Sequence, residues 1–371
     1  MSVPLLDLKR EWEEVAQEVK EEWERVFATM RLFNGENLLA FEKEVAEYLG
    51  VQFAYGTASG SDALLLGLIA CGIGPGDQVI LHANAFAADV ETIKWAGARP
   101  VLVDARESDF GPDPDQVEKA VTPQTKALMV VHMYGHPVDM DPLLEICRRR
   151  NLILIEDASH AHGAEYMSKK VGTLGQVGCF SCGVVKNLNA LGDAGFAVTN
   201  DPDVAHRLNY LRNHGQVKKN DHQFYGFNSR LDELQAVILR ARLKRLEEKN
   251  ERRREIAWIY SRAFQGIEGL TTPPQDGPEK KSVYHRYIIR TPLRDQLMAY
   301  LKEKGIGTGI YYPVPLHLQK AWQREGYPSG SFPVSEKLAR ESLAIPLFPE
   351  MEDEEIERVI RAVKEFFGGR A

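Results

Sequence analysis

The chain has 371 residues, 44% of them hydrophobic and 27% charged, which is an average composition for a soluble protein of two domains or of one large domain with an appendage. Lysine and arginine number 46 and aspartate and glutamate 53, so the formal charge is −7, without the basic excess expected of a nucleic-acid-binding protein. The N-terminus lacks the apolar core of a signal peptide, and the longest apolar stretch, residues 63–73, is too short to span a bilayer, so we expect no membrane partner.

Helical and extended patterns alternate through the first part of the chain. Apolar residues at helical spacing predict an amphipathic helix over residues 9–30 and a shorter one over 38–49. Strands and helices then alternate, and this order predicts a mostly parallel sheet with helices on both sides. The predicted strands are 51–55, 78–81, 99–103, 127–131 and 152–155, and the predicted helices are 63–71, 86–95, 114–121 and 140–150.

Two segments beside these strands could bind a ligand. Residues 56–62 are small and lead directly into a helix, whose first N–H groups and positive dipole end favour an anion. Ser59 and Ser61 are also good N-caps, so an ordinary capped helix is the alternative. Asp157 comes just after a buried strand, where ligands bind in open α/β sheets, although an aspartate there can also cap a turn.

Residues 179–200, CFSCGVVKNLNALGDAGFAVTN, contain a single lysine, Lys186, between a small apolar segment and a Gly-rich turn that leads into a predicted strand at 196–199. Such a lysine is either an ordinary solvated side chain or an amine whose pKa is lowered by desolvation, so that it can form a Schiff base. Cys179 and Cys182 form a C-x-x-C, but no second pair completes a zinc site, so we interpret both as core residues and expect no metal. Four cysteines in all fit a reducing cytosol and predict a cytoplasmic protein.

The remainder of the chain predicts a second, smaller α/β domain. A long helix is expected over 231–264, followed by a linker at 271–281, TTPPQDGPEKK. A strand at 283–290, a helix at 294–304, a strand at 306–312 and a last helix at 352–367 follow. We therefore place the large domain at residues 1–250 and the small domain at 251–371.

Six stretches in order resemble the DegT/StrS family of nucleotide-sugar aminotransferases that depend on pyridoxal phosphate, and together they cover nearly the whole chain. They are SGSDALLLGL, EDASHAHGA, FSCGVVKNLNALGDAGFAVTND, GFNSRLDELQA, YYPVPLHLQ and FPVSEKLARESLAIPLFP. The resemblance implies an α/β fold of the aspartate-aminotransferase type (fold type I), with a large domain around a mostly parallel sheet and a smaller C-terminal α/β domain. It also implies pyridoxal 5′-phosphate (PLP), with its amine form PMP, as the cofactor.

The resemblance implies a role for each matching residue. Lys186 would hold the cofactor as a Schiff base and later move the proton, and Asp157 would pair with the pyridinium nitrogen. The other implied cofactor contacts are Gly60, Ser61 and Ser181 at the phosphate, Phe86 on the ring, His160 at the phenolic oxygen, and Asn228 of the partner subunit in a homodimer with shared active sites. Tyr311 and His317 would lie on the substrate side.

The chain also departs from the family at several of these positions. Cys182 and Gly183 stand where aromatic residues are usual, His160 where glutamine is usual, and Tyr311 where histidine is usual. The turn KNLNALGDAG resembles the branch that aminates C3 of the sugar, because the C4 branch usually has a Gly-Glu-Gly-Gly type of turn there.

The implied function is a ping-pong aminotransferase. It would take the amino group of L-glutamate, release 2-oxoglutarate and aminate a keto sugar nucleotide, expected to be a 3-keto sugar. The alternatives are a C4-specific aminotransferase, a dehydratase of the same fold, in which histidine replaces the lysine, and a regulatory or interaction protein that has lost the chemistry. A nicotinamide oxidoreductase is disfavoured because no G-x-G-x-x-G stands between a first strand and helix. The sequence leaves the sugar, its nucleotide and the stereochemistry open.

Overall fold

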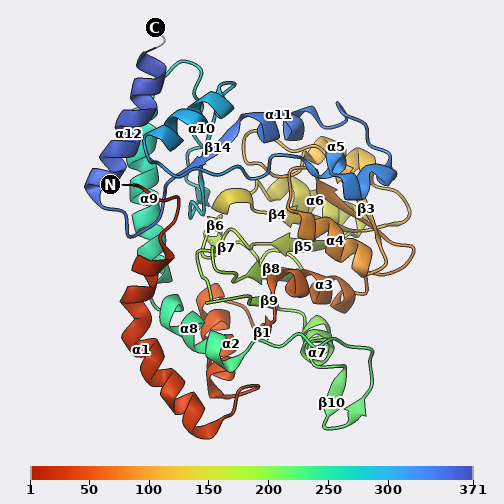
Figure 1. Ribbon diagram of the computed structural model, residues 1–371. Helices are drawn as coiled ribbons and strands as arrows, with labels where there is room; N and C mark the ends of the chain where they lie inside the picture. The colour runs from red at the N-terminus through yellow and green to blue at the C-terminus, as the bar shows by residue number, and fades with distance from the viewer. Residues whose placement is uncertain (1, 370–371) are drawn as a thin grey trace.

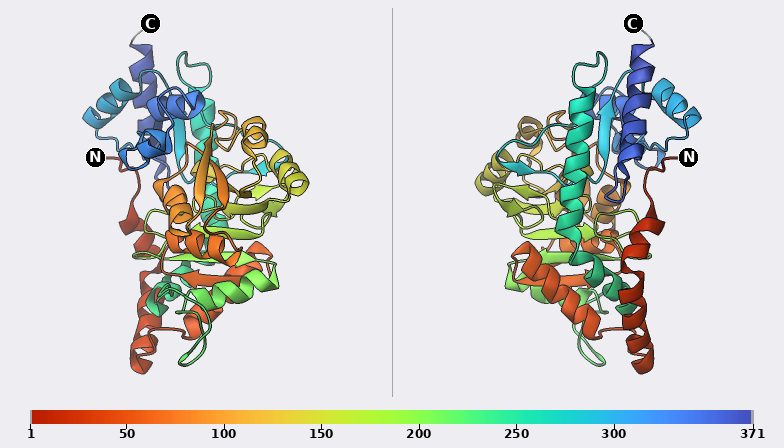
Figure 2. Two further views of the ribbon diagram at one scale, coloured as in Figure 1. Left: turned by 90° about the vertical axis from the view of Figure 1, so that its right-hand side faces the viewer. Right: turned by 90° about the vertical axis from the view of Figure 1, so that its left-hand side faces the viewer.

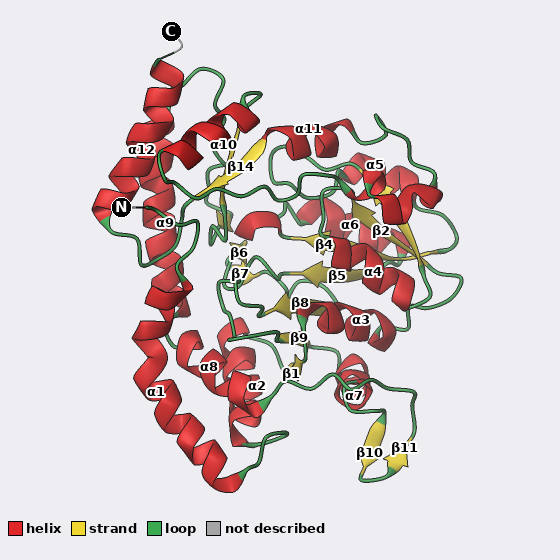
Figure 3. Cartoon of the chain, viewed as in Figure 1, coloured by secondary structure: helices red, strands yellow, loops and turns green. Residues whose placement is uncertain are grey.

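The computed structural model describes residues 2–369, which form an α/β protein built on one central sheet (Figures 1 and 3). Across this seven-stranded sheet the order is β1 (Phe53–Thr57), β9 (Gly195–Thr199), β8 (Val177–Ser181), β5 (Ile153–Asp157), β4 (Thr125–Val131), β2 (Gln78–His82) and β3 (Arg99–Val103). The pairs from β8 to β3 are parallel, and β9 is antiparallel to both of its neighbours. The predicted mostly parallel sheet is confirmed.

Hydrophobic clusters lie on both faces of the sheet. One contains side chains of α2 (Glu36–Leu49), α5 (Pro114–Ala120), α6 (Asp141–Arg150) and α8 (Glu233–Leu243), and the other those of α3 (Gly60–Ala70), α4 (Ala87–Trp95), α7 (Pro202–Leu211) and α11 (Pro333–Glu341). In β4, Leu128 and Val130 belong to the first cluster and Ala127 and Met129 to the second, as the two-residue period of a strand requires. The apolar runs of the sequence are therefore strands buried on both faces.

A third cluster gathers most of the C-terminal elements. It unites α9 (Leu246–Phe264), α12 (Asp353–Gly368) and α10 (Arg294–Glu303) with β13 (Tyr287–Arg290) and β14 (Ser342–Ile345), which pair antiparallel. Figure 2 shows α9 and α12 side by side at one end of the molecule. The proposed boundary at residue 250 falls inside α9, and the division into two domains stays a prediction.

The first helix, α1 (Leu8–Thr29), packs on α8 through Val15, Val19 and Val26, so the amphipathic helix predicted over residues 9–30 is confirmed. Short strands complete the described part of the chain: β6 (Glu165–Tyr166) pairs with β7 (Lys169–Lys170) and β12 (Lys280–Lys281), and β10 (Gln216–Lys218) pairs with β11 (Asp221–His222). None of the helices in residues 2–369 has the length and apolar character that crossing a bilayer requires.

Three predicted elements differ in the structure. The helix expected over 231–264 is wrong, because α8 ends before Arg245, whose φ is −107° and whose N–H bonds to the carbonyl of Arg242, three residues back rather than four. The strand expected over 283–290 begins only at Tyr287, because Tyr284 has a left-handed φ of 41°. The strand expected over 306–312 is also wrong, since that segment makes only isolated bridges, from Ile306 and Gly309.

Candidate active site

A cavity of about 370 Å³ opens where β5 and β8 end, which is the edge of a parallel sheet where ligands bind. The starts of α3 and α4 also reach it, together with a segment of the C-terminal part of the chain. Eight of the residues singled out from the sequence line this cavity: Gly60, Ser61, Phe86, Asp157, His160, Ser181, Lys186 and Tyr311.

Lys186 lies in a loop that hydrogen bonds hold at both ends. The N–H of Cys182 bonds to the carbonyl of Ala194 at 2.7 Å, and the N–H of Ala190 bonds to the carbonyl of Cys182 at 2.7 Å. Burial lowers the pKa of Lys186 to about 8, although the nearby charge of Asp157 opposes this shift. About a tenth of the amine is therefore neutral and nucleophilic at pH 7, far more than for a lysine with the ordinary pKa of about 10.4.

The start of α3 lies tightly against the end of β8. Ser59 caps this helix by accepting the N–H of Asp62 at 3.1 Å, and the following residue is Gly60. A Cβ atom on Gly60 would lie only 2.4 Å from the Cβ of Ser181, so only glycine lets the helix start approach the Ser181 hydroxyl. The result is a compact set of N–H and O–H donors, as an anion requires.

Asp157 is the last residue of β5 and is buried beside the cavity. One of its oxygens accepts the N–H of Ser159 at 2.9 Å. Ser159 in turn accepts the N–H of Ser181 through its hydroxyl at 3.0 Å, which links the carboxylate to the Ser181 end of the cavity. The cavity therefore combines an acidic side chain with anion-binding donors.

His160 stacks on His285 with ring centres 4.5 Å apart. Its Nδ1 accepts the N–H of Tyr134 at 3.3 Å, and burial, together with the charges of Lys186 and Arg286, holds the pKa of His160 well below its ordinary value. A neutral ring with Nδ1 as an acceptor carries its proton on Nε2. His160 can therefore donate a hydrogen bond through Nε2.

Aromatic rings form another wall of the cavity. The rings of Phe86 and Tyr312 lie 5.1 Å apart, and Tyr311 meets Tyr312 edge-on at 5.9 Å. The guanidinium of Arg286 lies 5.3 Å from the centre of the Tyr311 ring. These rings provide flat apolar surface for a planar ligand in the cavity that Lys186 also lines.

Two residues assigned from the resemblance lie outside this cavity. His317 is buried, with Nε2 3.0 Å from a carboxylate oxygen of Glu336. Asn228 is exposed and forms an isolated bridge with Asn213, beyond the β10–β11 hairpin. The roles of both residues stay predictions.

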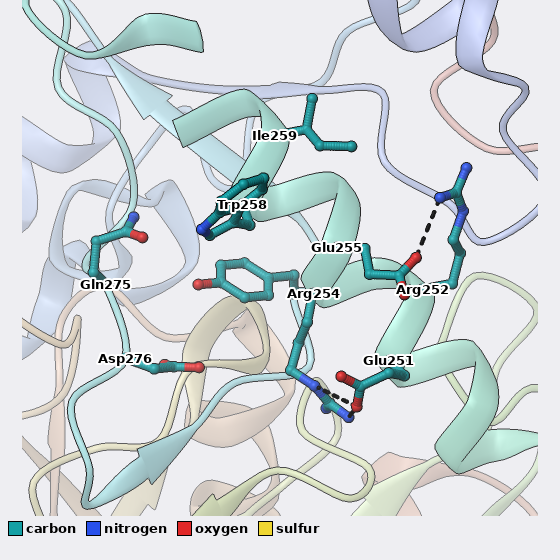
Figure 4. Close-up of a pocket in the computed structure, with 9 residues that line it drawn as sticks. Glu251, Arg252, Arg254, Glu255, Trp258, Ile259, Gln275 and Asp276 are labelled. Atoms are coloured by element: carbon teal, nitrogen blue, oxygen red, sulfur yellow. Dashed lines mark hydrogen bonds and ion pairs between the residues drawn. The ribbon is translucent and has the colours of Figure 1, made fainter. Parts of the chain in front are cut away.

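A larger hollow of about 600 Å³ lies along α9, away from the ends of the sheet strands (Figure 4). Four of its charged side chains are paired with one another: Arg252 donates to Glu255 at 3.2 Å, and Arg254 pairs with Glu251. Trp258 lies against Arg262 at 4.7 Å. This hollow has neither an unpaired amine nor a strand-end carboxylate, so the smaller cavity is the candidate active site.

Comparison with known proteins places this site in context. The model of the DegT/DnrJ/EryC1/StrS aminotransferase family matches residues 13–364. The chain belongs to this family. A pleiotropic regulatory protein of Geobacillus stearothermophilus is 41% identical over 99% of both chains. The dTDP-3-amino-3,4,6-trideoxy-alpha-D-glucose transaminase of Streptomyces venezuelae is 43% identical, covering 98% of this chain and 96% of that protein. The crystal structure of S. venezuelae DesV with a ketimine intermediate matches with a TM-score of 0.96 at 43% identity, covering 98% of each chain.

A DegT/DnrJ/EryC1/StrS aminotransferase uses PLP, and the cavity fits this cofactor. A phosphate group needs several donors without bulk, which the start of α3 and Ser181 supply. The aldehyde needs a neutral amine, which the lowered pKa of Lys186 provides. The ring nitrogen needs an anion, and Asp157 is a buried carboxylate. Each functional group of PLP thus has a matching residue.

Other cavity residues of this DegT/DnrJ/EryC1/StrS aminotransferase were not found from the sequence. Ser159 lay inside a matched stretch, where its spacing of two from Asp157 is the signal of a turn that binds a carboxylate. His285 and Tyr312 come from C-terminal segments in which the sequence pattern predicts strands, so no local pattern indicated a binding site there. Ser59 had been named only as an N-cap within the predicted anion-binding segment 56–62, and the residues missed are Leu64, Ala88, Val131, Met133, Ser159, Val185, Asp193, His285 and Tyr312.

Gly60→Ala is expected to weaken PLP binding about tenfold to hundredfold, the effect of losing one or two hydrogen bonds to a charged group. The added methyl would lie against Ser181 and push the start of α3 away from it. Fluorescence titration of the cofactor-free protein with PLP measures the change. Gly277→Ala is the matched control, because a Cβ at position 277 would meet nothing within 4 Å. Equal affinities for the two variants would contradict this role of Gly60.

The rate at which the cofactor-free protein captures PLP is expected to rise with pH and to level off above about 8, the pKa of Lys186. Below this pH the amine is protonated, and the reactive fraction falls about tenfold for each pH unit. Stopped-flow absorbance across the pH range provides the measurement. A rate that continues to rise toward pH 10, as for an ordinary lysine, would show that burial does not lower this pKa.

Proposed function

We propose that the protein transfers the amino group of L-glutamate to C3 of a keto sugar nucleotide. The observation that carries the proposal is the meeting, in one cavity, of a lysine with a lowered pKa and a strand-end carboxylate. The Streptomyces venezuelae relative, named as the transaminase of a 3-amino sugar nucleotide, supports the class of substrate. The identity of the sugar and of its nucleotide is left to experiment.

Different residues of the cavity would perform different steps of this reaction. PLP, when bound, supplies an aldehyde that takes up the amino group and a ring that stabilises negative charge at the carbon from which a proton leaves. The neutral amine of Lys186 would accept this proton at Nζ and return it to the neighbouring carbon. The carboxylate of Asp157 would hold a proton on the ring nitrogen, and His160 would donate its Nε2–H to the phenolic oxygen.

The other cavity residues would bind and shield the reactants. Gly60, Ser61 and Ser181 would hold the phosphate, which fixes the cofactor at the start of α3. Phe86 would stack on the ring, and Tyr311 would contact the sugar. His317 is proposed to act on the substrate side only through its neighbours, because its Nε2 faces Glu336.

We propose that the active form is a homodimer in which Asn228 of each subunit reaches the phosphate in the other. The segment that carries Asn228 also exposes apolar rings, with Phe224 exposed by 45%, Tyr225 by 102% and Phe227 by 38%. It follows the β10–β11 hairpin, which projects from the body of the molecule (Figure 1). Clustered exposed rings of this kind mark interaction surfaces.

Mixing two inactive variants tests the shared site. Lys186→Ala and Asn228→Ala homodimers, unfolded and refolded together, are expected to regain part of the activity, because a mixed dimer contains one site in which both residues are intact. Analytical ultracentrifugation of each variant is the control for assembly. If each subunit's site were complete in itself, no activity would return beyond that of the Asn228→Ala protein alone.

We further propose that the enzyme acts in the cytoplasm. Its four cysteines are free and three of them are buried, as in a protein of a reducing compartment. Localisation of a fluorescent fusion would test this proposal.

The reaction is tested by colour. Protein loaded with PLP is expected to lose its yellow absorbance on addition of L-glutamate and to regain it on addition of a 3-keto sugar nucleotide. Recovery with a 4-keto sugar nucleotide alone would indicate C4 specificity. The relative from Geobacillus stearothermophilus is named a regulatory protein, so a purely regulatory role is the second candidate. Protein that stays colourless with added PLP would favour that role.

A further inference from the structure

A second carboxyl group lies behind Asp157. Asp89 is in the first turn of α4 and has no solvent exposure. Its Oδ2 accepts the N–H of Phe86 at 3.0 Å, which caps the helix. Its Oδ1 is buried and has no hydrogen-bond donor among residues 2–369. A buried carboxylate oxygen without a donor is costly, so this oxygen needs a proton or a partner.

The carboxyl group that acts most strongly on Asp89 is that of Asp157, which is also buried. Two neighbouring carboxyl groups that are buried away from water do not both ionise, because the two negative charges would repel each other, and one group keeps its proton. Burial, and then the charge of Asp157, raises the pKa of Asp89 well above its ordinary value. One oxygen of Asp157 accepts the N–H of Ser159 at 2.9 Å, whereas Oδ1 of Asp89 has no donor, so we place the proton on Asp89.

The other ionisable groups around Asp89 are consistent with a proton on Asp89 and a negative charge on Asp157. Lys186 is the cation that acts on it, and this amine also acts on Asp157. The hydroxyl of Tyr312 and the thiol of Cys179 both have a raised pKa, chiefly because they are buried, so neither adds a charge near neutral pH. The pair therefore carries one negative charge and one proton.

We propose that Asp89 is a positioning residue whose neutral carboxyl group donates its Oδ1 hydrogen to the carboxylate of Asp157. The hydrogen bond fixes the orientation of Asp157 and withdraws part of its charge, so that Asp157 is the single anion available to the cofactor ring nitrogen. The proton stays on Asp89 and none is consumed. This inference rests on the proposed role of Asp157 toward PLP.

Infrared spectroscopy of the cofactor-free protein tests the proton directly. At neutral pH the wild-type protein is expected to have the carbonyl stretch of a protonated carboxylic acid, and Asp89→Asn is expected to lose it. Asp201→Asn is the matched control, because Asp201 caps α7 and is exposed. If the Asp89→Asn and wild-type spectra agree in this region, Asp89 is ionised and the proposal is wrong, whatever reaction the enzyme catalyses.

A pair of variants tests the effect on Asp157. In Asp89→Asn the amide can still donate to Asp157 and accept from Phe86, so affinity for PLP and the pH dependence of its bound absorbance are expected to stay near those of the wild type. In Asp89→Leu the donor is lost, and affinity is expected to fall about tenfold to hundredfold. Equal behaviour of the two variants would overturn the proposal. Wild-type protein that L-glutamate does not bleach would instead count against the proposed function and leave the infrared result unchanged.

Discussion

Lys186→Ala is expected to lower kcat by at least about 10⁴-fold, the upper end of what proton transfer contributes, because this amine also anchors the cofactor. Among residues 2–369, Lys186 is the lysine that lines the cavity, so its amine is the one in position to act. Steady-state kinetics with L-glutamate and a 3-keto sugar nucleotide measure the loss. Borohydride reduction of PLP-loaded wild type, followed by peptide mapping, is expected to place the label on Lys186.

The fold is expected to survive this substitution. The loop is held by main-chain hydrogen bonds of Cys182 and Ala190 and by the side chain of Asn189, which accepts from Arg242 at 2.8 Å. These contacts do not involve the Lys186 amine. Lys126→Ala, at an exposed position of β4, is the matched control and is expected to be fully active. Sustained multiple turnover by Lys186→Ala, with contaminating enzyme excluded, would remove the basis of the proposed function.

Asp157→Asn is expected to lower kcat by about 10²- to 10³-fold, the usual effect of removing one group that stabilises charge at a reacting centre. The amide keeps the size of the side chain and an oxygen for the N–H of Ser159, so the loss comes from the charge. Asp232→Asn, at an exposed position before α8, makes the same chemical change away from the cavity and is expected to have no effect.

The same substitution is expected to shift the pH dependence of PLP capture toward lower pH. The negative charge of Asp157 raises the pKa of Lys186 against the lowering effect of burial. Without that charge the amine becomes neutral at a lower pH than about 8. An unchanged midpoint together with a normal kcat would indicate that Asp157 serves only the turn at Ser159.

The sheet could be predicted from the sequence because its strands are short apolar runs between helices with a clear period. The strand at 99–103 has the predicted bounds, and most others differ by one or two residues. The C-terminal errors have a different origin. No proline or glycine in the sequence signals the helix break before Arg245. Tyr284 has its left-handed φ next to Val283, whose N–H bonds to the carbonyl of Gly135, in a loop that follows strand β4.

The cavity residues taken from the resemblance came from segments with distinctive local sequences, such as the glycine before α3. Asp89, in contrast, occupies an ordinary capping position of an ordinary helix. The role proposed for it arises only because Asp157, at the end of β5, acts on it electrostatically, although the two residues are 68 positions apart in the sequence. Such a meeting depends on the packing of α4 against the sheet, which no single segment encodes.

Gly60, at the start of α3, and Gly183, in the loop of Lys186, differ in how well they would tolerate a larger side chain. Around Gly60 no extra carbon fits, whereas a Cβ on Gly183 would meet only the hydroxyl oxygen of Ser181, at 3.6 Å, an ordinary contact distance. Evolution or an engineer could therefore vary position 183 while the cofactor cradle remains intact. The loop that carries Lys186 can therefore accept a larger side chain at position 183.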